Sequence, residues 1–152
     1  MSIEQRLKEL GITVPEPAKP VAAYVPAVIS GNLVYTAGQI PLKDGQLAFK
    51  GKVGQELSLE QGYEAAKICT INCLAAIKGV LGSLDRVKRV VKVTGFVNSA
   101  PGFTDQPKIV NGASELLVQV FGEKGKHARS AVGVAELPLN AAVEVEMVVE
   151  FE

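Results

Sequence analysis

The chain has 152 residues, of which 47% are hydrophobic, so it can bury a core of its own, and we expect one domain spanning residues 1–152. Its 16 basic and 16 acidic residues leave a formal net charge of zero, which argues against a dedicated nucleic-acid-binding or membrane-surface protein. No apolar run approaches the roughly 20 residues of a membrane-spanning helix. The charged start MSIEQRLKELGI is unlike a secretory signal, so we expect a cytoplasmic protein.

The first 50 residues predict a helix, an extended arm and short strands. The amphipathic start is typical of a helix over residues 2–10, and three prolines indicate an arm that completes an N-terminal segment of residues 1–20. Ser30-Gly31-Asn32 is typical of a hairpin turn, and Asp44-Gly45 predicts a second turn. The prolines are Pro15, Pro17 and Pro20, and the expected strands cover residues 23–30, 33–38 and 47–49.

A long amphipathic helix is predicted next. Ser58 and Gln61 have the spacing of a capping box, and Gly82 is a natural end for the helix. Its apolar stripe consists of Tyr63, Ala66, Cys69, Cys73, Ala76, Ile77 and Val80. We interpret the two cysteines as ordinary core residues, because two thiols four residues apart do not make a metal site. A strand over 86–98 follows, and its expected buried face consists of Val87, Val91, Val93 and Val97.

A second helix and two strands complete the chain. Thr104 is the expected cap of this helix, Pro107 fits its first turn and Gly122 ends it. Its buried stripe consists of Ile109, Val110, Ala113, Leu117, Val120 and Phe121, and the strands lie near 129–135 and 142–151. The element order predicts an α+β fold with two helices on one face of a four- or five-stranded mixed sheet. Small residues on the other face indicate an oligomer.

The last two strands carry the residues that point most clearly to a ligand. If they pair as a hairpin, with Val134 opposite Val143, then Arg129 and Glu144 share the uncovered face of the sheet. This register places them roughly 13 Å apart, with Ala131 and Gly133 between them. The arginine fork matches a carboxylate, and the glutamate could position water or exchange a proton. The alternative is that Arg129 forms a surface ion pair and the glutamates solvate an edge strand.

Other candidate sites are weaker. His127 is the only histidine and lies among lysines and glycine, which favours a solvated loop over a catalytic or metal-binding role. Gly51-Lys52-Val53-Gly54 lacks the ending of a phosphate-binding loop. A modest basic strand could contact RNA, but charge runs of this kind are usually solvated faces. Its members are Arg86, Lys88, Arg89 and Lys92.

Several segments, occurring in the same order, resemble the YjgF family, also called Rid for reactive intermediate deaminase. They are AYVPAVISGNLVYTAGQIP (23–41), TGFVNS (94–99), IVNGASELL (109–117) and ARSAVGVAELPLNAAVEVE (128–146). The resemblance covers about residues 21–151, and the R-S-x-V-x-V-x-x-L-P block is its most specific part. The long N-terminal arm and the A-P-G-F-T-D-Q-P loop resemble a longer subgroup of roughly 150 residues.

The resemblance implies a chorismate-mutase-like α+β fold and a homotrimer with pockets at the subunit interfaces. It implies hydrolysis of enamines and imines such as 2-aminoacrylate to a keto acid and ammonia, without a metal or an organic cofactor. By the same resemblance, Arg129 binds the carboxylate of a small metabolite and Glu144 helps to hold the attacking water. Tyr24 and Asn111 contribute to the pocket, and Gly38 and Phe96 help to shape it.

Two positions depart from the deaminase branch of the family. Ala37 stands where that branch usually has serine, and Ala131 stands where it usually has cysteine. The leading hypothesis is still deamination of a 2-enamino or 2-imino acid. The alternatives are a trimeric binding protein for a keto acid or an amino acid metabolite, without turnover, and an RNA-acting or translation-inhibiting protein. Turnover distinguishes the first two hypotheses, because both require Arg129.

Overall fold

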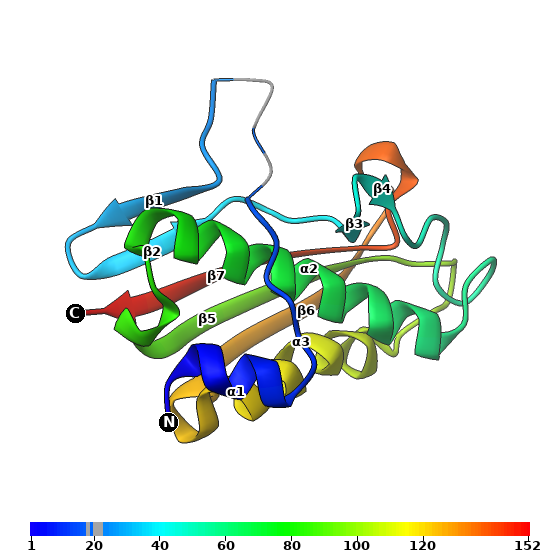
Figure 1. Cartoon of the computed structure of the whole chain (residues 1–152). Coiled ribbons are helices and arrows are strands. Elements are labelled where there is room, and N and C mark those ends of the chain that lie inside the picture. Colours follow the sequence, from blue (N-terminus) through cyan, green and yellow to red (C-terminus); the bar gives the residue numbers. More distant parts are fainter. Residues whose placement is uncertain (18, 20–22) are drawn as a thin grey trace.

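The computed structural model describes residues 1–17, 19 and 23–152, so Pro20 of the predicted arm lies outside the described residues. A five-stranded mixed sheet has the order β1-β2-β7-β5-β6, and helices cover one of its faces (Figure 1). The strands are β1 Ala27–Ser30, β2 Leu33–Thr36, β5 Val87–Asn98, β6 Ala128–Val134 and β7 Val143–Phe151. The helices are α1 Ile3–Glu9, α2 Leu59–Leu81 and α3 Gln106–Phe121. The predicted α+β class is confirmed.

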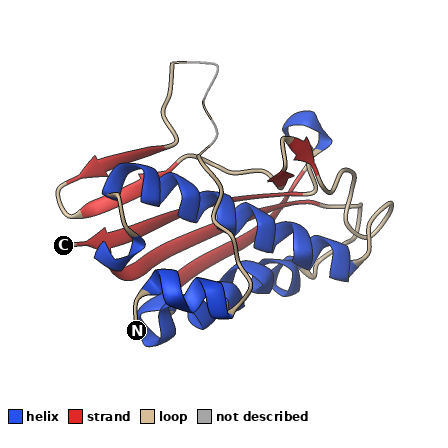
Figure 2. Cartoon of the chain, in the orientation of Figure 1, coloured by secondary structure: helices blue, strands red, loops and turns tan. Residues whose placement is uncertain are grey.

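Short elements connect these strands and helices. The turn at Asp44-Gly45 joins two strands that form a separate small sheet, rather than preceding a single strand. These strands are β3 Leu42–Lys43 and β4 Gln46–Leu47, and the 3-10 helices are η1 Leu84–Arg86, η2 Gly122–Gly125 and η3 Pro138–Asn140. Figure 2 shows the three α-helices on the same side of the large sheet. Among the described residues, no helix is long and apolar enough to cross a bilayer.

Local capping signals explain where the long helices begin and end. The Ser58 side chain accepts a hydrogen bond from the Gln61 backbone N–H, and the Gln61 side chain accepts one from the Ser58 backbone N–H. Gly82 ends α2 with φ +83°. In α3 the predicted cap is wrong: the helix begins after Asp105 rather than Thr104, and no side chain caps it. Pro107 lies in its first turn, as predicted.

Irregular pairing in β5 changes which valines are buried. The register of β5 against β7 shifts between Val87 and Arg89 and again between Val90 and Lys92. A bulge of this kind adds a residue to one strand and so breaks simple alternation. Val90 is therefore fully buried, whereas Val91 is 36% exposed, and the prediction of Val91 as a buried residue is wrong.

The predicted hairpin between the last two strands is also wrong. β6 pairs with β5 in parallel, and β5 lies between β6 and β7. Parallel neighbours need a crossover, and α3 supplies it between β5 and β6. Arg129 lies opposite Val93, a core residue that also pairs with Met147, so Arg129 faces the helices. Glu144 instead alternates with the buried residues of β7 and faces the uncovered side.

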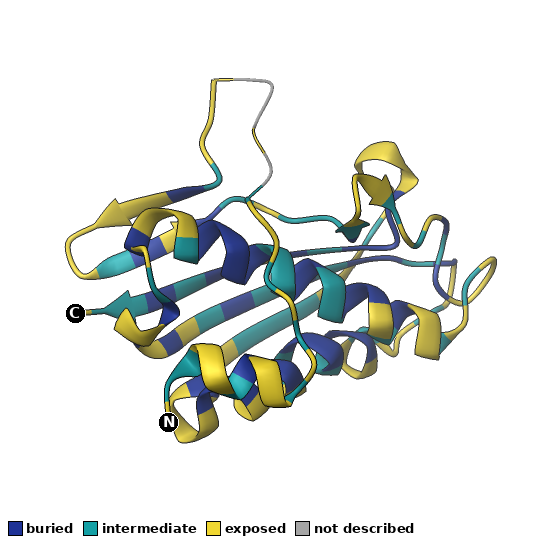
Figure 3. Cartoon of the chain, viewed as in Figure 1, coloured by how far each residue is buried: buried dark blue, intermediate teal, exposed yellow. Residues whose placement is uncertain are grey.

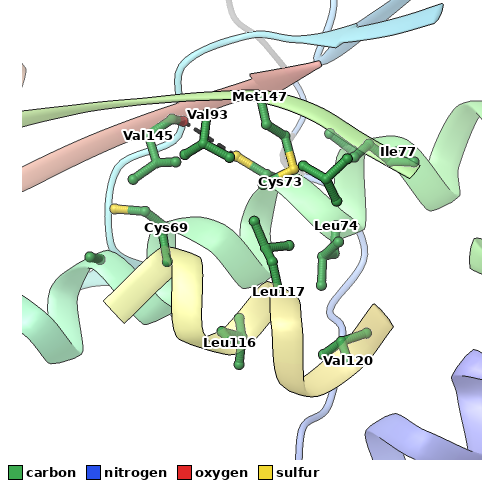
Figure 4. Close-up of a cluster of buried hydrophobic side chains, with 14 of the residues drawn as sticks. Cys69, Cys73, Leu74, Ile77, Val93, Leu116, Leu117, Val120, Val145 and Met147 are labelled. Atoms are coloured by element: carbon green, nitrogen blue, oxygen red, sulfur yellow. Dashed lines mark hydrogen bonds between the residues drawn. The ribbon is translucent and has the colours of Figure 1, made fainter. Parts of the chain in front are cut away.

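The core lies between the sheet and the two long helices. Figure 3 shows buried positions along α2, α3 and the central strands, and Figure 4 shows side chains of these elements meeting. Cys69 and Cys73 are free and fully buried, as predicted. Their thiols donate hydrogen bonds to the carbonyl oxygens of Val143 and Val145, respectively. Burial raises the pKa of the Cys73 thiol to about 12 and also raises that of Cys69. The two thiols are therefore core groups rather than nucleophiles.

The opposite face of the sheet carries exposed apolar side chains. Val28 on β1 is 51% exposed, Tyr35 on β2 is 46% exposed and Val132 on β6 is 43% exposed. These three alternate with residues that point toward the helices. Large apolar side chains spread across one sheet face are typical of a surface that another chain covers.

Candidate functional site

The eight expected site residues fall into two groups on opposite faces of the sheet. One group lies on or beside the uncovered face, near the junction of β2 and β7. The other lies at the edge strand β6 and the adjoining helix α3. The first group is Tyr24, Ala37, Gly38, Phe96 and Glu144, and the second is Asn111, Arg129 and Ala131.

The first group borders a hollow of about 620 Å³. Its lining includes Tyr24, Ala37, Gly38 and Glu144, together with apolar residues from the η3 segment. Phe96 is not part of that lining, but it lies opposite Glu144 on β5 and is partly buried. The hollow therefore combines one carboxylate with a mostly apolar wall.

Leu139 is a residue of this hollow that the sequence analysis missed. It lies in η3 with φ +59°, and its side chain is 70% exposed. A leucine in the left-handed region is strained by roughly 1–2 kcal/mol. No periodic pattern signals this conformation, although Pro138 directly before it and Asn140 directly after it are typical of a turn and could have drawn attention to the segment.

Glu144 is held in a confined place. Its carboxylate lies against Gly38, where a Cβ atom would overlap Oε2. Burial raises the pKa of Glu144, and the nearby charge of Glu146 raises it further. No hydrogen bond to the Glu144 side chain occurs within the described part of the chain. A half-buried carboxylate with a raised pKa is suited to accept a proton or to hold a water molecule.

Arg129 is anchored to α3 by one end of its guanidinium group. Its Nη1 donates to Asn111 Oδ1 at 2.8 Å and to Ser114 Oγ at 3.2 Å. Among residues 1–17, 19 and 23–152, no carboxylate forms an ion pair with it. Ala131, two residues along β6, packs against the core beneath α3. Arg129 is thus a partly buried cation whose described partners are neutral.

His127 joins the same cluster. It lies in a loop between η2 and β6, as expected, but its side chain is half-buried rather than solvated. Its Nε2 lies 2.9 Å from Ser114 Oγ, and its Nδ1 lies 2.6 Å from the Gly125 carbonyl oxygen. Burial lowers the pKa of His127, and the charge of Arg129 lowers it further. Sequence analysis missed Ser114 as well, but its position one helical turn after Asn111 places both on one face of α3.

Arg129 and Glu144 are too far apart in one chain to contact the same small ligand. Arg129 aligns with Met147 through β5, so Glu144 lies two strands across and three residues along. This separation is roughly 14 Å, and the two side chains leave opposite faces. The expectation that they bound one gap on one face is wrong. Gly133 does not form the base of such a gap either, because a Cβ atom there would meet the side chain of Gln106 in α3.

The basic strand does not present a continuous cationic surface. Arg86 donates hydrogen bonds to the carbonyl oxygens of Leu81 and Glu152, and it lies over the ring of Phe151. The backbone of Arg89 lies opposite that of Glu150 in the β5–β7 register, so a carboxylate alternates with the basic residues here. These contacts favour the structural interpretation of the basic residues over an RNA-binding one.

A second hollow, of about 410 Å³, lies between the N-terminal arm, the β3–β4 hairpin and α2. Its lining includes Pro15, Leu42 and Ile71 and none of the expected site residues. Within the described residues, no cluster of three His, Cys, Asp or Glu side chains could hold a metal ion. The expected site residues therefore all lie outside this second hollow.

Comparisons with known proteins identify the family of the chain. Residues 4–151 match the family described as "YjgF/chorismate_mutase-like, putative endoribonuclease". Atu1372 of Agrobacterium tumefaciens, a protein of unknown function, is 48% identical, with a TM-score of 0.93 over 99% of this chain and 92% of that one. Protein TCP17 of Trypanosoma cruzi is 46% identical over 97% of this chain and 93% of its own length. A 2-iminobutanoate/2-iminopropanoate deaminase of Dermatophagoides farinae is 33% identical, over 93% and 95% respectively.

Proposed function

The chain belongs to the YjgF/chorismate mutase-like (Rid) family, and on that premise we propose that it hydrolyses 2-enamino or 2-imino acids to keto acids and ammonia. The single observation that carries this proposal is the Arg129 guanidinium, which is partly buried and has only neutral partners among the described residues. An unpaired cation in such a place is suited to the carboxylate of a small ligand, because its planar fork matches that group.

The catalytic site is completed between subunits of a homotrimer. In one chain, Arg129 and Glu144 leave opposite faces of the sheet, so both can reach one small acid only if they come from different chains. The exposed apolar residues Val28, Tyr35 and Val132 support burial of the uncovered sheet face against other copies. Each pocket then combines Arg129 of one subunit with the Glu144 hollow of its neighbour.

The reaction needs positioning and modest proton transfer. Arg129 binds the carboxylate, and a 2-enamino acid first tautomerises to the imine, as its carbon gains a proton from water and its nitrogen loses one to water. Water held by Glu144 adds to the imine carbon while the carboxylate takes one of its protons. The carboxylate passes this proton to the nitrogen, which gives the carbinolamine. It then takes the hydroxyl proton and passes it to the same nitrogen as the carbon–nitrogen bond breaks, and ammonia and the keto acid leave. One water molecule is consumed, and neither a metal nor an organic cofactor is required for this balance.

A binding protein without turnover is the second candidate. Ala37 lines the hollow and Ala131 lies beside Arg129, so neither position supplies the polar group found in the deaminase branch. Arg129 and the apolar wall of the hollow would still retain a keto acid or an amino acid metabolite. The two candidates predict the same ligand class and differ only in turnover.

The deciding assay measures ammonia release from 2-aminoacrylate and larger imino acids generated in situ from amino acids. We expect the wild-type protein to accelerate release, and Arg129→Ala to abolish that acceleration because the carboxylate loses its partner. Arg89→Ala, which removes an arginine of β5 outside the site, is the matched control and should retain full activity. Binding of keto acids without any accelerated release would favour the second candidate.

A further inference from the structure

Ser114 and His127 form a chain of hydrogen bonds that ends on Arg129. The His127 Nδ1 atom lies 2.6 Å from the carbonyl oxygen of Gly125, and its Nε2 lies 2.9 Å from Ser114 Oγ. Ser114 Oγ in turn accepts from Arg129 Nη1 at 3.2 Å. The three side chains come from β6, α3 and the segment after η2, so the chain ties three separate parts of the fold to one guanidinium.

The direction of each hydrogen bond follows from the Gly125 carbonyl. A carbonyl oxygen can only accept, so His127 Nδ1 carries the proton and donates it. In the neutral ring Nε2 is then an acceptor, and it takes the hydroxyl proton of Ser114. The Ser114 oxygen is thereby turned toward Arg129 with its lone pairs. Burial lowers the pKa of His127, which favours the neutral ring that this order requires.

The same contacts determine which edge of Arg129 remains for a ligand. A guanidinium group has five N–H donors, two of them on Nη1. One Nη1 hydrogen is donated to Asn111 and the other to Ser114. In the described part of the chain, no hydrogen bond uses Nε or Nη2 of Arg129. These two nitrogens form an edge whose parallel N–H groups match the two oxygens of a carboxylate.

We propose that Ser114 and His127 are positioning residues that fix Nη1 of Arg129 and so present its Nε–Nη2 edge to the carboxylate of the ligand. The inference rests on the proposed function for the class of ligand. Ser114 and His127 lie outside the residues assigned to the site, and both act through Arg129 rather than on the ligand. The pre-set edge reduces the conformational freedom that Arg129 loses on binding.

A purely structural role is the competing explanation, because the same bonds hold β6 against α3. Conservative variants separate the two. Ser114→Ala removes the hydroxyl, whereas Ser114→Thr keeps it. His127→Leu removes the acceptor, whereas His127→Gln keeps an acceptor near the place of Nε2. Glu115→Ala is the matched control on α3, because Glu115 is exposed and bonds to Tyr63 instead of Arg129.

The first measurement is a titration of the full-length protein with pyruvate. Binding is monitored through the Nε–H resonance of Arg129 in NMR spectra. We expect the resonance to shift on binding, and Ser114→Ala and His127→Leu to bind pyruvate about tenfold more weakly, as for loss of one hydrogen bond to a charged group. Ser114→Thr, His127→Gln and Glu115→Ala should bind within about twofold of wild type. Equal weakening in Glu115→Ala, or binding without a shift of Arg129 Nε–H, would overturn the inference. So would the absence of pyruvate binding to wild type.

The second measurement does not require a ligand. NMR of the His127 ring nitrogens should show the Nδ1-protonated tautomer in wild type, with a changed Nε2 resonance in Ser114→Ala. The opposite tautomer would overturn the proposed order of hydrogen bonds. If pyruvate binds as described but no imino acid is turned over, the proposed deaminase function fails while this inference stands. With an active enzyme, Ser114→Ala should raise KM about tenfold and leave kcat within about twofold.

Discussion

Gly38 and Glu144 form a close pair at the mouth of the larger hollow. The Glu144 carboxylate occupies the space that a Cβ atom on Gly38 would need, and Gly38 has no positive φ that would otherwise demand glycine. The only requirement for glycine that the structure reveals here is therefore the room it leaves for this carboxylate. Gly38 thus leaves the space in which the Glu144 carboxylate lies.

A methyl group at position 38 should displace that carboxylate. We expect Gly38→Ala to lower kcat about 10- to 100-fold, since a misplaced catalytic group loses much of its effect, and to leave the fold intact. Steady-state kinetics with 2-aminoacrylate measure this loss. In a Glu144→Gln background the same substitution should cause little further loss, because its effect acts through Glu144. Additive losses in the double variant would show that Gly38 acts by another route.

The raised pKa of Glu144 predicts an acidic limit to activity. The ionised form is needed to take a proton from water, so kcat/KM should fall as the pH drops through the pKa of this carboxyl group. Because burial raises that pKa, the midpoint should lie above the ordinary glutamate value of about 4.3. A pH–rate profile measures it, and Glu144→Gln should lack the inflection. A midpoint at or below the ordinary value would contradict the assignment.

The same shift has a consequence for stability. A carboxyl whose pKa is higher in the folded state binds protons more readily there than in the unfolded chain, so its ionisation opposes folding as the pH rises through that window. Glu144→Gln should therefore be slightly more stable than wild type at pH 7 and no more stable well below pH 4. Urea unfolding at both pH values tests this difference.

Asn98 supports the wall of the hollow from below. It is fully buried, its Nδ2 donates to Asn140 Oδ1 and the Ala141 carbonyl, and its Oδ1 accepts from Lys52 Nζ. Asn98→Ala should lower the free energy of unfolding by about 2–3 kcal/mol, because buried partners are left unpaired. Asn32→Ala, which removes an exposed bond to Glu150, is the control and should cost less than about 1 kcal/mol. Equal costs in urea unfolding would contradict this role.

The strained backbone of Leu139 should lower the free energy of unfolding, while its side chain contacts the ligand. Glycine adopts positive φ without strain, so Leu139→Gly should raise the free energy of unfolding by roughly 1 kcal/mol. Because Leu139 lines the hollow, the same variant should lose more affinity for imino acids with long apolar side chains than for 2-aminoacrylate, compared with wild type. The ratio of kcat/KM for the two substrates measures this. An unchanged ratio would mean that Leu139 does not contact the substrate.

Local signals accounted for most of the fold. The capping pair at Ser58 and the glycine at 82 predicted both ends of α2 because each acts within one helical turn. Strand pairing is not local. Alternation shows which residues of β6 share a face, but it does not show that β5 lies between β6 and β7. Because the sequence does not reveal this strand order, the predicted hairpin placed Arg129 on the uncovered face of the sheet instead of the face toward the helices.

The candidate site was likewise predictable only in part. Arg129 and Asn111 were expected to share a site through a family resemblance, and the structure joins them by a hydrogen bond. The part played by His127 could not be foreseen, because its ring reaches α3 only after η2 and β6 are in place. Lysine-rich neighbours in sequence made it look solvated, whereas tertiary packing half-buries it.

The most direct test of the account is complementation between two inactive variants. Arg129→Ala and Glu144→Gln chains carrying different tags would be coexpressed, purified through both tags and assayed with 2-aminoacrylate. If each pocket takes Arg129 from one subunit and Glu144 from its neighbour, every mixed trimer holds one intact pocket, and about one third of wild-type activity should return. Doubly tagged trimers of Arg129→Ala alone are the control and should stay inactive. Mixed trimers as inactive as that control would contradict a site shared between subunits.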